Sequence, residues 1–275
     1  MSKTFGLALG SGGSRGLAHI LMCEALDELG CKPVAVAGSS VGALVGAAYC
    51  AGMSGKEMRR HVMGLAHDRA EVFRRLIATR GSTFASLLSA GLGSMTLVDA
   101  EKFCTQFLPG MVPARFEDLP LPLIVIASDL YRREQVAFSS GPLWPALAAS
   151  IALPTLMRPV MIDGHVLIDG GATNPLPFEH LRGRADVIVA VEISGPVSAD
   201  QREVPNALEC LYATVLVMTH SIISEKLRHG APDLFLQPKV GSFRALGFLQ
   251  ASAILRAADP VKAEFKERLA KLIGA

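Results

Sequence analysis

The stretch Val34-Ala-Val-Ala-Gly-Ser-Ser-Val-Gly-Ala-Leu44 organises the rest of the chain. Its first half is apolar and β-branched, which is typical of a buried strand, and its second half has the small-residue pattern of a packed helix. Between the halves lies Gly38-Ser-Ser-Val-Gly42, a G-x-S-x-G motif. A serine on such a strand-to-helix turn exposes its Oγ at a helix N-terminus, while the two glycines leave room for the turn and the helix behind it. The stretch therefore predicts an exposed, reactive Ser40 on an α/β sheet.

Composition bounds the class of protein. The chain has 275 residues, of which 50% are hydrophobic and 19% charged, so it can bury one large α/β domain, alone or with a helical extension. The formal net charge of +2 is too near neutral to indicate nucleic acid as a partner. The cysteines are widely spaced and odd in number, which favours a reducing compartment, and the apolar part of the N-terminus is too short for a signal peptide. We expect a cytoplasmic protein.

Two uncharged runs raise the question of a membrane span. Residues 33–55 carry Gly38, Gly42 and Gly46 at the spacing found in paired membrane helices. This run begins as a strand, however, and continues the alternation of strands and helices that starts at residue 4. Residues 135–157 contain three prolines, which one lipid-exposed helix does not tolerate. We expect neither run to cross a membrane.

The N-terminal part follows a β-loop-α-β-turn-α order. Residues 4–9 read as a strand, the apolar periodicity after residue 17 marks a helix that ends near Gly30, and residues 34–37 read as a second strand. This order predicts two parallel strands joined by a right-handed crossover. The loop after the first strand and the serine turn after the second then lie together at the carboxyl edge of the sheet, where open α/β sheets place their sites.

The loop Gly10-Ser-Gly-Gly-Ser-Arg-Gly16 permits two interpretations. As a phosphate cradle it lacks the Lys-Ser/Thr of a P-loop, its spacing departs from the dinucleotide fingerprint, and no acidic ribose partner follows the second strand. As an oxyanion hole, its consecutive glycines let backbone N–H groups face a developing negative charge. The neighbouring serine motif favours the oxyanion hole. Arg15 either holds the loop or binds an anionic substrate group, and both readings stay open.

Residues 54–98 have two distinct halves. Residues 54–80 look helical and carry more basic than acidic side chains. We favour a solvated helix face, and a surface that meets anionic lipid is the alternative. Residues 81–98 contain no charge at all. They fit a lid, one wall of an acyl pocket or a buried core segment equally well.

The rest of the chain continues the alternation of strands and helices. The expected elements are a helix over 99–107 capped by Asp99, strands over 121–129 and 135–138, a helix over 142–150, a hairpin over 157–168 turning at Asp163-Gly164, a strand over 187–193, a helix over 206–228, and a last amphipathic helix opened by Asp259-Pro260 as N-cap and first helical residue.

Ser40 needs a base, and the sequence favours an aspartate. Ser40 comes too early in the chain for the usual hydrolase order of serine, acid and histidine, and none of the seven histidines follows a suitable strand. His19 and His180 read as structural. Asp169 ends an apolar strand and is followed by two glycines, so desolvation would raise its pKa towards that of a useful base. A turn aspartate is the alternative interpretation of Asp169, because Asp-Gly is common in turns. Asp129 and Asp163 are rivals, but Asp163-Gly164 is better explained as the hairpin turn.

Four motifs occur in order along the chain: Leu9-Gly-Ser-Gly-Gly-Ser-Arg-Gly-Leu-Ala-His19, Gly38–Gly42, Ala149-Ser-Ile-Ala-Leu-Pro154 and Asp169-Gly-Gly-Ala-Thr-Asn-Pro-Leu-Pro177. Together they resemble the patatin-like phospholipase family, and more narrowly its bacterial members. The resemblance implies a three-layer α/β/α patatin-like sheet with a nucleophile elbow. It further implies a catalytic domain over residues 4–195. We expect residues 196–275 to form a mainly helical extension packed on the same domain.

The resemblance also implies a Ser–Asp dyad without histidine. Ser40 is then the nucleophile, Asp169 is the base, and Gly12 and Gly13 supply oxyanion N–H groups. Ser11 stands here in the first place of the family's usual run of three glycines. The residues expected to support the loop, the elbow and the Asp-Gly-Gly turn are Gly10, Arg15, Gly16, Gly38, Gly42, Gly170 and Gly171.

The expected function is that of a serine acyl-ester hydrolase of phospholipase A, lysophospholipase or carboxylesterase type. Its partner is a lipid or acyl-ester substrate, with membrane contact through residues 54–98, and it needs no metal or cofactor. A patatin-like module that binds lipid or regulates with little catalysis is the alternative, and a nucleotide-binding protein is a third reading. The sequence does not specify the acyl chain, the head group or the oligomeric state.

Overall fold

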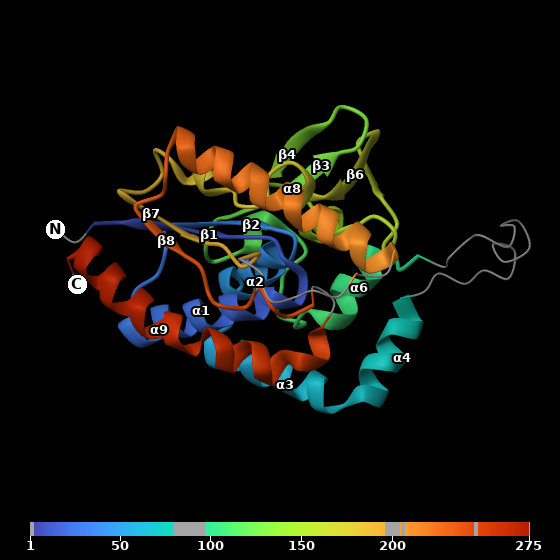
Figure 1. Ribbon diagram of the computed structural model, residues 1–275, viewed down its shortest axis with the longest axis horizontal. Helices are drawn as coiled ribbons and strands as arrows, with labels where there is room; N and C mark the ends of the chain where they lie inside the picture. Colours follow the sequence, from blue (N-terminus) through green and yellow to red (C-terminus); the bar gives the residue numbers. More distant parts are fainter. Residues whose placement is uncertain (1–2, 80–96, 196–203, 205–206, 245–246, 275) are drawn as a thin grey trace, which may run out of the picture.

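A mixed eight-stranded sheet lies between two layers of helices (Figure 1). The computed structural model describes residues 3–79, 97–195, 204, 207–244 and 247–274. The strands, in chain order, are β1 (Phe5–Leu9), β2 (Ala35–Ser39), β3 (Leu123–Asp129), β4 (Glu134–Phe138), β5 (Val160–Ile162), β6 (His165–Asp169), β7 (Val187–Val191) and β8 (Leu234–Leu236).

The strand order brings the expected loops to one edge. Strands β3, β2, β1, β7 and β8 are parallel neighbours in that order, while β4 and β6 pair antiparallel with β3 and β5 pairs with β6. The predicted parallel pairing of the first two strands is confirmed, with Leu7 opposite Val36. The loops that follow β1 and β2 therefore start side by side.

Helices are interspersed with the strands along the chain. The α-helices are α1 (His19–Leu29), α2 (Val41–Cys50), α3 (Gly55–His67), α4 (Arg69–Thr79), α6 (Ala100–Phe107), α7 (Leu143–Ile151), α8 (Ala207–His229) and α9 (Ala251–Ile273). The short 3-10 helices are η1 (Gly13–Ala18), η2 (Phe116–Asp118), η3 (Gly170–Ala172), η4 (Phe178–Leu181) and η5 (Phe248–Gln250).

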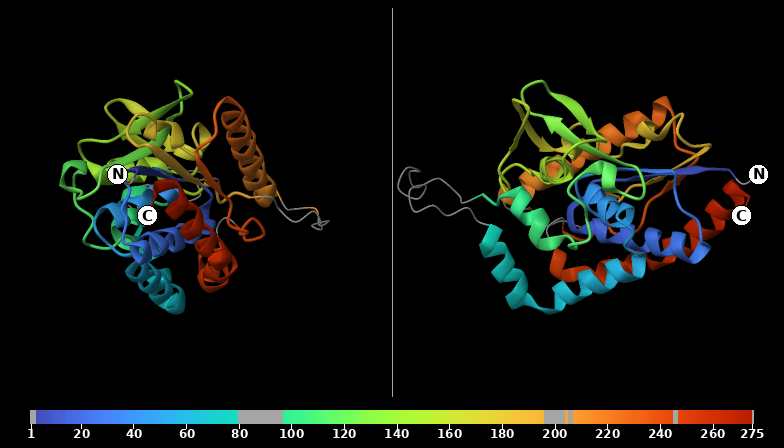
Figure 2. Two further views of the ribbon diagram at one scale, coloured as in Figure 1. Left: turned by 90° about the vertical axis from the view of Figure 1, so that its left-hand side faces the viewer. Right: turned by 180° about the vertical axis from the view of Figure 1, so that it is seen from behind.

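Alternation along the buried strands sends side chains into two cores. Leu7 and Leu9 of β1 belong to the large core that also contains residues of α1, α2 and α9. Ala8, between them, belongs to a smaller core with η4 and Ile223 of α8. Figures 1 and 2 show α8 on one side of the sheet and α1, α2, α3 and α9 on the other. The predicted three-layer α/β/α class is confirmed.

The start of the last helix was predicted wrongly from Asp259-Pro260. Helix α9 begins at Ala251, nine residues before the predicted first helical residue, and Pro260 lies inside it. A proline inside a helix removes one backbone hydrogen bond and costs about 3 kcal/mol. Leu255, Ala258, Val261 and Phe265 form one buried stripe that passes straight across the proline. Burial of that stripe beside α1 outweighs the local signal to begin a helix at the proline.

The predicted hairpin turn and the predicted cap at Asp99 are confirmed. The hairpin turns at Asp163, whose φ is 49°, and Asp99 accepts a hydrogen bond from the Lys102 N–H as the cap of α6. Strand β8, which joins the sheet beside β7, was not anticipated. The division into domains at residue 195 stays a prediction.

Two further predictions concern membranes and the uncharged stretch after residue 80. No helix in the described part of the chain has both the length and the apolarity that a bilayer crossing requires. The helix that follows Ser40, which lies in the first uncharged run, has only 10 residues. Apart from residues 97 and 98, the uncharged 81–98 stretch falls outside the described residues, so its role as lid, pocket wall or core stays a prediction.

Candidate active site

Ser40 lies at the tight turn between β2 and α2. Its φ of 54° and ψ of −125° are rare for a residue with a side chain and cost roughly 1–3 kcal/mol. The turn is close-packed, because a Cβ on Gly42 would lie 2.2 Å from the Leu9 carbonyl oxygen. The Ser40 N–H donates to the Ser150 Oγ at 2.9 Å, which helps to hold the strained backbone. The result is a fixed serine, only partly buried, at the N-terminus of a helix.

Asp169, at the end of β6, meets the serine directly. The Ser40 Oγ donates to Asp169 Oδ2 at 2.6 Å, and the Gly171 N–H donates to Asp169 Oδ1 at 2.7 Å. The side chain of Ser128 donates to the Asp169 carbonyl at 2.9 Å, which ties the turn to β3. Ser40 and Asp169 are 129 residues apart in the chain, and the antiparallel pairing of β6 with β3 brings them together.

Burial decides the acidity of this carboxyl group. Asp169 is only 7% exposed. Desolvation raises its pKa from 3.8 to about 6, although the hydrogen bonds from Ser40 and Gly171 act in the opposite direction. At neutral pH the group is therefore mostly ionised, yet much more basic than an exposed aspartate. A carboxylate with these properties is suited to accept the proton of the serine that it contacts.

The Gly-rich loop lies against the elbow and the Asp-Gly-Gly turn. Gly16 packs on Val41, the first residue of α2, and a Cβ on Gly171 would lie 2.9 Å from the Ser11 Oγ. Gly12 and Gly13 have φ values of 157° and 63°, which a side chain would oppose. The loop is tied at its start, where the Gly10 N–H donates to the Val191 carbonyl. The structure thus brings together the loop, the elbow and the Asp-Gly-Gly turn.

Arg15 and His19 hold the loop from behind. Arg15 is 4% exposed, and its Nε donates to the Phe243 carbonyl at 2.7 Å. This geometry favours the interpretation of Arg15 as a residue that holds the loop. His19 is fully buried, its Nε2 donates to the Gly10 carbonyl at 2.9 Å, and burial lowers its pKa to about 4. His19 is therefore neutral and structural in character.

The rival aspartates have other partners. Asp129 accepts the Tyr131 and Arg132 N–H groups and a hydrogen bond from His165, and these contacts lower its pKa. Asp163 lies at the exposed hairpin turn. Among the described residues, no histidine is hydrogen-bonded to Ser40 or Asp169.

Ser150 was not predicted as part of the site, although it lies in the third of the four motifs, Ala149-Ser-Ile-Ala-Leu-Pro154. Ser150 is fully buried in α7 and accepts the N–H of Ser40. The available signal was a lone hydroxyl in an otherwise apolar run from residue 143 to residue 153. A buried serine in such a helix needs a partner for its polar atom, and here the partner is the elbow.

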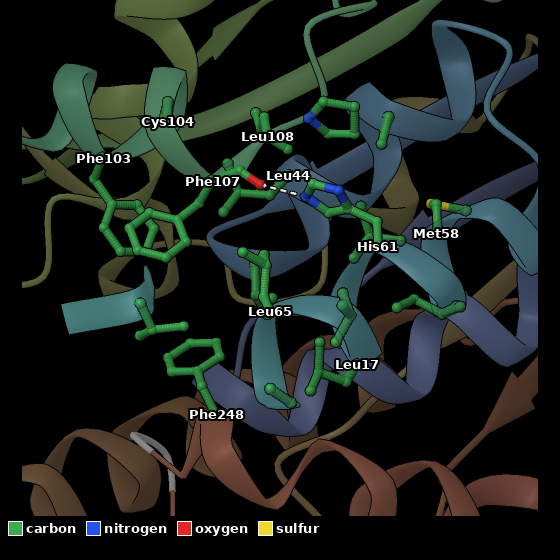
Figure 3. A pocket seen from close by; sticks show the side chains of 18 of the residues that line it. Leu17, Leu44, Met58, His61, Leu65, Phe103, Cys104, Phe107, Leu108 and Phe248 are labelled. Atoms are coloured by element: carbon green, nitrogen blue, oxygen red, sulfur yellow. Dashed lines mark hydrogen bonds between the residues drawn. The ribbon is translucent and has the colours of Figure 1, made fainter. Parts of the chain in front are cut away.

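An apolar cavity of about 450 Å³ opens beside the elbow (Figure 3). It lies between α1, α2, α3, α4, α6 and η5, and Val41, the neighbour of Ser40, forms part of its wall. His61 is a polar exception in this wall, and its Nε2 donates to the Phe107 carbonyl at 2.9 Å, as the dashed line shows. The apolar sides of α3 and α4 thus line a cavity, which their charged residues did not reveal.

Comparison with known proteins identifies the family of the chain. Residues 7–182 match the family described as patatin-like phospholipase. The chain is 36% identical over 203 residues to an uncharacterized NTE family protein of Mycobacterium tuberculosis, a match that covers 74% of this chain and 52% of that one. It is 28% identical over 192 residues to lysophospholipase nte1 of Aspergillus fumigatus, covering 70% and 12%. The chain thus spans about half the length, or less, of these curated relatives.

The fold is also similar to that of a solved structure. VipD from Legionella pneumophila superposes with a TM-score of 0.50 at 13% sequence identity, over 97% of this chain and 67% of that chain. At this identity the likeness concerns the fold alone.

Proposed function

The chain belongs to the patatin-like phospholipase family, and from that premise we propose that it is a serine-dependent hydrolase of lipid acyl esters. The observation that carries the proposal is the 2.6 Å hydrogen bond from Ser40 to a buried carboxylate whose pKa is raised to about 6. A serine hydroxyl becomes a nucleophile when an adjacent base accepts its proton as it attacks. Asp169 fills that role in the proposal, and no histidine is required.

The proposed reaction has two halves. Asp169 accepts the proton of Ser40 while the Oγ attacks the ester carbonyl, and the resulting tetrahedral intermediate expels the alcohol, which takes the proton back from Asp169. This leaves an acyl group on Ser40. In the second half Asp169 accepts a proton from water, the hydroxide attacks the acyl carbonyl, and Ser40 is released with its proton restored while the fatty acid departs.

The negative charge of each tetrahedral intermediate needs donors. In the proposal these are the N–H groups of Gly12 and Gly13, supported by the N-terminus of α2. The Ser40 N–H does not contribute, because it already donates to Ser150. Removal of one such donor typically costs about 2.7–4 kcal/mol of transition-state stabilisation.

The apolar cavity supports a lipid as substrate. Its volume of about 450 Å³ lies in the range of roughly 300–1,000 Å³ typical of ligand pockets. Val41 connects the elbow to the cavity wall, so an acyl chain bound there would bring its carbonyl towards Ser40. A fungal relative carries the name lysophospholipase, which makes lysophospholipids the first lipid class to test.

We further propose that the protein is cytoplasmic and binds the bilayer peripherally through residues 54–98. Phe73 and Ile77 of α4 are 66% and 51% exposed, and Phe248 and Leu249 of η5 are also exposed. Three of these side chains, Phe73, Phe248 and Leu249, also line the cavity. Exposed apolar side chains at the mouth of an apolar cavity fit a lipid surface. Vesicle sedimentation of F73S/I77S should show weaker binding to phosphatidylglycerol vesicles, and unchanged binding contradicts this part.

We propose that residues 4–195 form the catalytic domain and that residues 196–275 fold with it rather than apart. Strand β8 lies in the same sheet as β7, and α9 packs beside α1. Deletion of this extension should therefore unfold the protein, and a folded, cooperative 1–195 fragment contradicts the proposal.

The test of the function uses three variants of the full chain and two substrates, p-nitrophenyl butyrate and lysophosphatidylcholine. Ser40→Ala should abolish hydrolysis of both, and Asp169→Asn should lower it at least about 10²-fold. Ser39→Ala is the matched control, since the neighbouring Ser39 Oγ is buried and has no partner among the described residues. Full activity in Ser40→Ala overturns the proposal. Wild-type protein that binds lysophosphatidylcholine without hydrolysing it instead indicates the binding or regulatory module.

A further inference from the structure

A short segment after the Asp-Gly-Gly turn joins the two halves of the candidate site. The Asn174 N–H donates to the Gly170 carbonyl at 2.9 Å, so the segment closes the turn that carries the carboxylate. Its next residue, Pro175, accepts the Ser11 N–H of the Gly-rich loop at 2.8 Å. Any shift of this segment therefore changes the position of the base, of the oxyanion loop, or of both.

Lys226 of α8 contacts this segment, and α8 shares a core with Leu176 on the same face of the sheet. Its Nζ donates to Asn174 Oδ1 at 2.5 Å, to the Leu176 carbonyl at 2.6 Å and to Glu179 Oε2 at 2.6 Å. The ammonium group has three donors, and all three are used. The side chain is only 21% exposed, and its Nζ lies 4.9 Å from the centre of the Phe178 ring.

The contacts are strong ones. Hydrogen bonds from a charged donor are roughly twice as strong as neutral ones, and partial burial limits competition by water. Burial lowers the pKa of Lys226, but its contact with the Glu179 carboxylate favours the charged form. Two of the acceptors, Asn174 and Leu176, stand on either side of Pro175. The ammonium group thus fixes both neighbours of the residue that holds the Gly-rich loop.

We propose that Lys226 is a positioning residue for the reaction. It holds residues 174–176, and through them it sets the placement of the Asp169 carboxylate relative to the N–H groups of the Gly-rich loop. This inference rests on the proposed function, since it assigns the roles of base and oxyanion hole to those groups. It also gives a role to α8, which lies beyond the part of the chain that matches the family, residues 7–182.

The proposal predicts a selective loss of rate. Lys226→Met keeps most of the apolar stem but leaves three acceptors without their donor, so residues 174–176 should move. A displacement of about 1 Å in a catalytic constellation can lower the rate about 10²-fold, so we expect kcat to fall about 10- to 100-fold. KM for p-nitrophenyl butyrate should change less than about twofold, because the apolar cavity is built from other helices.

Lys262→Met is the matched control. The Lys262 Nζ bridges Glu24 Oε2 at 3.0 Å and Glu28 Oε1 at 2.6 Å, and its side chain is 18% exposed. The substitution removes a lysine side chain of similar exposure from the interface of α9 with α1, away from the two loops. It should lower stability, as Lys226→Met does, while kcat stays within about twofold of the wild type.

The experiment measures urea unfolding, kcat and KM for p-nitrophenyl butyrate, and the second-order rate of labelling by a fluorophosphonate probe. Lys226→Met should lose kcat and labelling rate together, and Lys226→Arg, which keeps the charge, should recover part of both. Equal labelling of Lys226→Met and wild type, or an equal loss in Lys262→Met, overturns the proposal. If Lys226→Met does not fold, Asn174→Ala, which removes only one contact of the ammonium group, has to show the same selective loss. Wild-type protein that does not label at all overturns the proposed function instead.

Discussion

Asp169→Asn should inactivate the protein and at the same time stabilise it at neutral pH. The carboxyl group is 7% exposed, and burial raises its pKa from 3.8 to about 6. The folded state therefore holds the proton more tightly than the unfolded chain does. Protonated Asp169 therefore adds to the free energy of unfolding, and this contribution is fully present below about pH 4 and is lost as the pH rises through about 6. Asparagine is neutral at every pH and escapes this loss.

The size of the effect follows from the two pKa values. One pKa unit is worth about 1.4 kcal/mol, so ionisation of Asp169 removes about 3 kcal/mol of stability between pH 4 and pH 8. The amide oxygen of the substituted asparagine can still accept the Gly171 N–H, and its NH2 group can donate to the Ser40 Oγ, which then acts as the acceptor. The free energy of unfolding of Asp169→Asn, relative to the wild type, should thus rise by about 3 kcal/mol over this pH range.

Urea unfolding of wild type and variant at pH 4, 6 and 8 measures this difference. Asp163→Asn is the control, because Asp163 lies at an exposed hairpin turn with a φ of 49°, which asparagine accepts readily. It should show no comparable gain with pH. A difference between Asp169→Asn and wild type that is the same at pH 4 and pH 8 refutes the claim that the carboxylate is held in a desolvated site.

Four further predictions concern activity and packing. Below pH 6, kcat/KM for short esters should fall about tenfold per pH unit, because only ionised Asp169 accepts a proton; a flat pH profile contradicts this. Ser150→Ala should lower kcat about tenfold at constant KM, as it removes the acceptor of the nucleophile's N–H, and an unchanged kcat refutes that role. Gly42→Ala should lower the free energy of unfolding by more than about 3 kcal/mol, since its Cβ would lie 2.2 Å from a β1 carbonyl oxygen, whereas Gly64→Ala, at an open position of α3, should raise it by up to about 1 kcal/mol. Thermal melts of the two variants measure the difference, and equal melting temperatures contradict this prediction. Leu65→Trp, which narrows the cavity, should raise KM for long-chain but not short-chain esters, and equal changes argue against an acyl pocket.

Much of the fold follows from local sequence signals. The elbow at Ser40, the hairpin turn at Asp163 and the cap at Asp99 each depend on residues within a few positions of one another. Long-range pairing is less visible. Strand β8 has only three residues, and nothing in Leu234–Leu236 alone indicates a partner in β7. The helix start predicted at Pro260 was wrong for a related reason, since apolar residues on both sides of the proline are buried and stabilise one continuous helix.

The candidate site likewise contains residues that local motifs predict and residues that only the folded structure reveals. Ser40, Asp169 and the Gly-rich loop stand in motifs whose order along the chain carries information. The residues that hold them, Ser150 and Lys226, contact the site from 110 and about 50 residues away. A lone lysine in a long helix usually faces water, so the sequence alone does not distinguish Lys226 from an ordinary surface lysine.

The most direct test of the central claim is to map the residue that a fluorophosphonate probe modifies in the wild-type protein. The probe reacts covalently with an activated serine, and peptide mass spectrometry identifies its position. The account predicts one modified peptide with the label on Ser40, and no label in Ser40→Ala. An unlabelled wild-type protein, or a label on another residue that persists in Ser40→Ala, contradicts it.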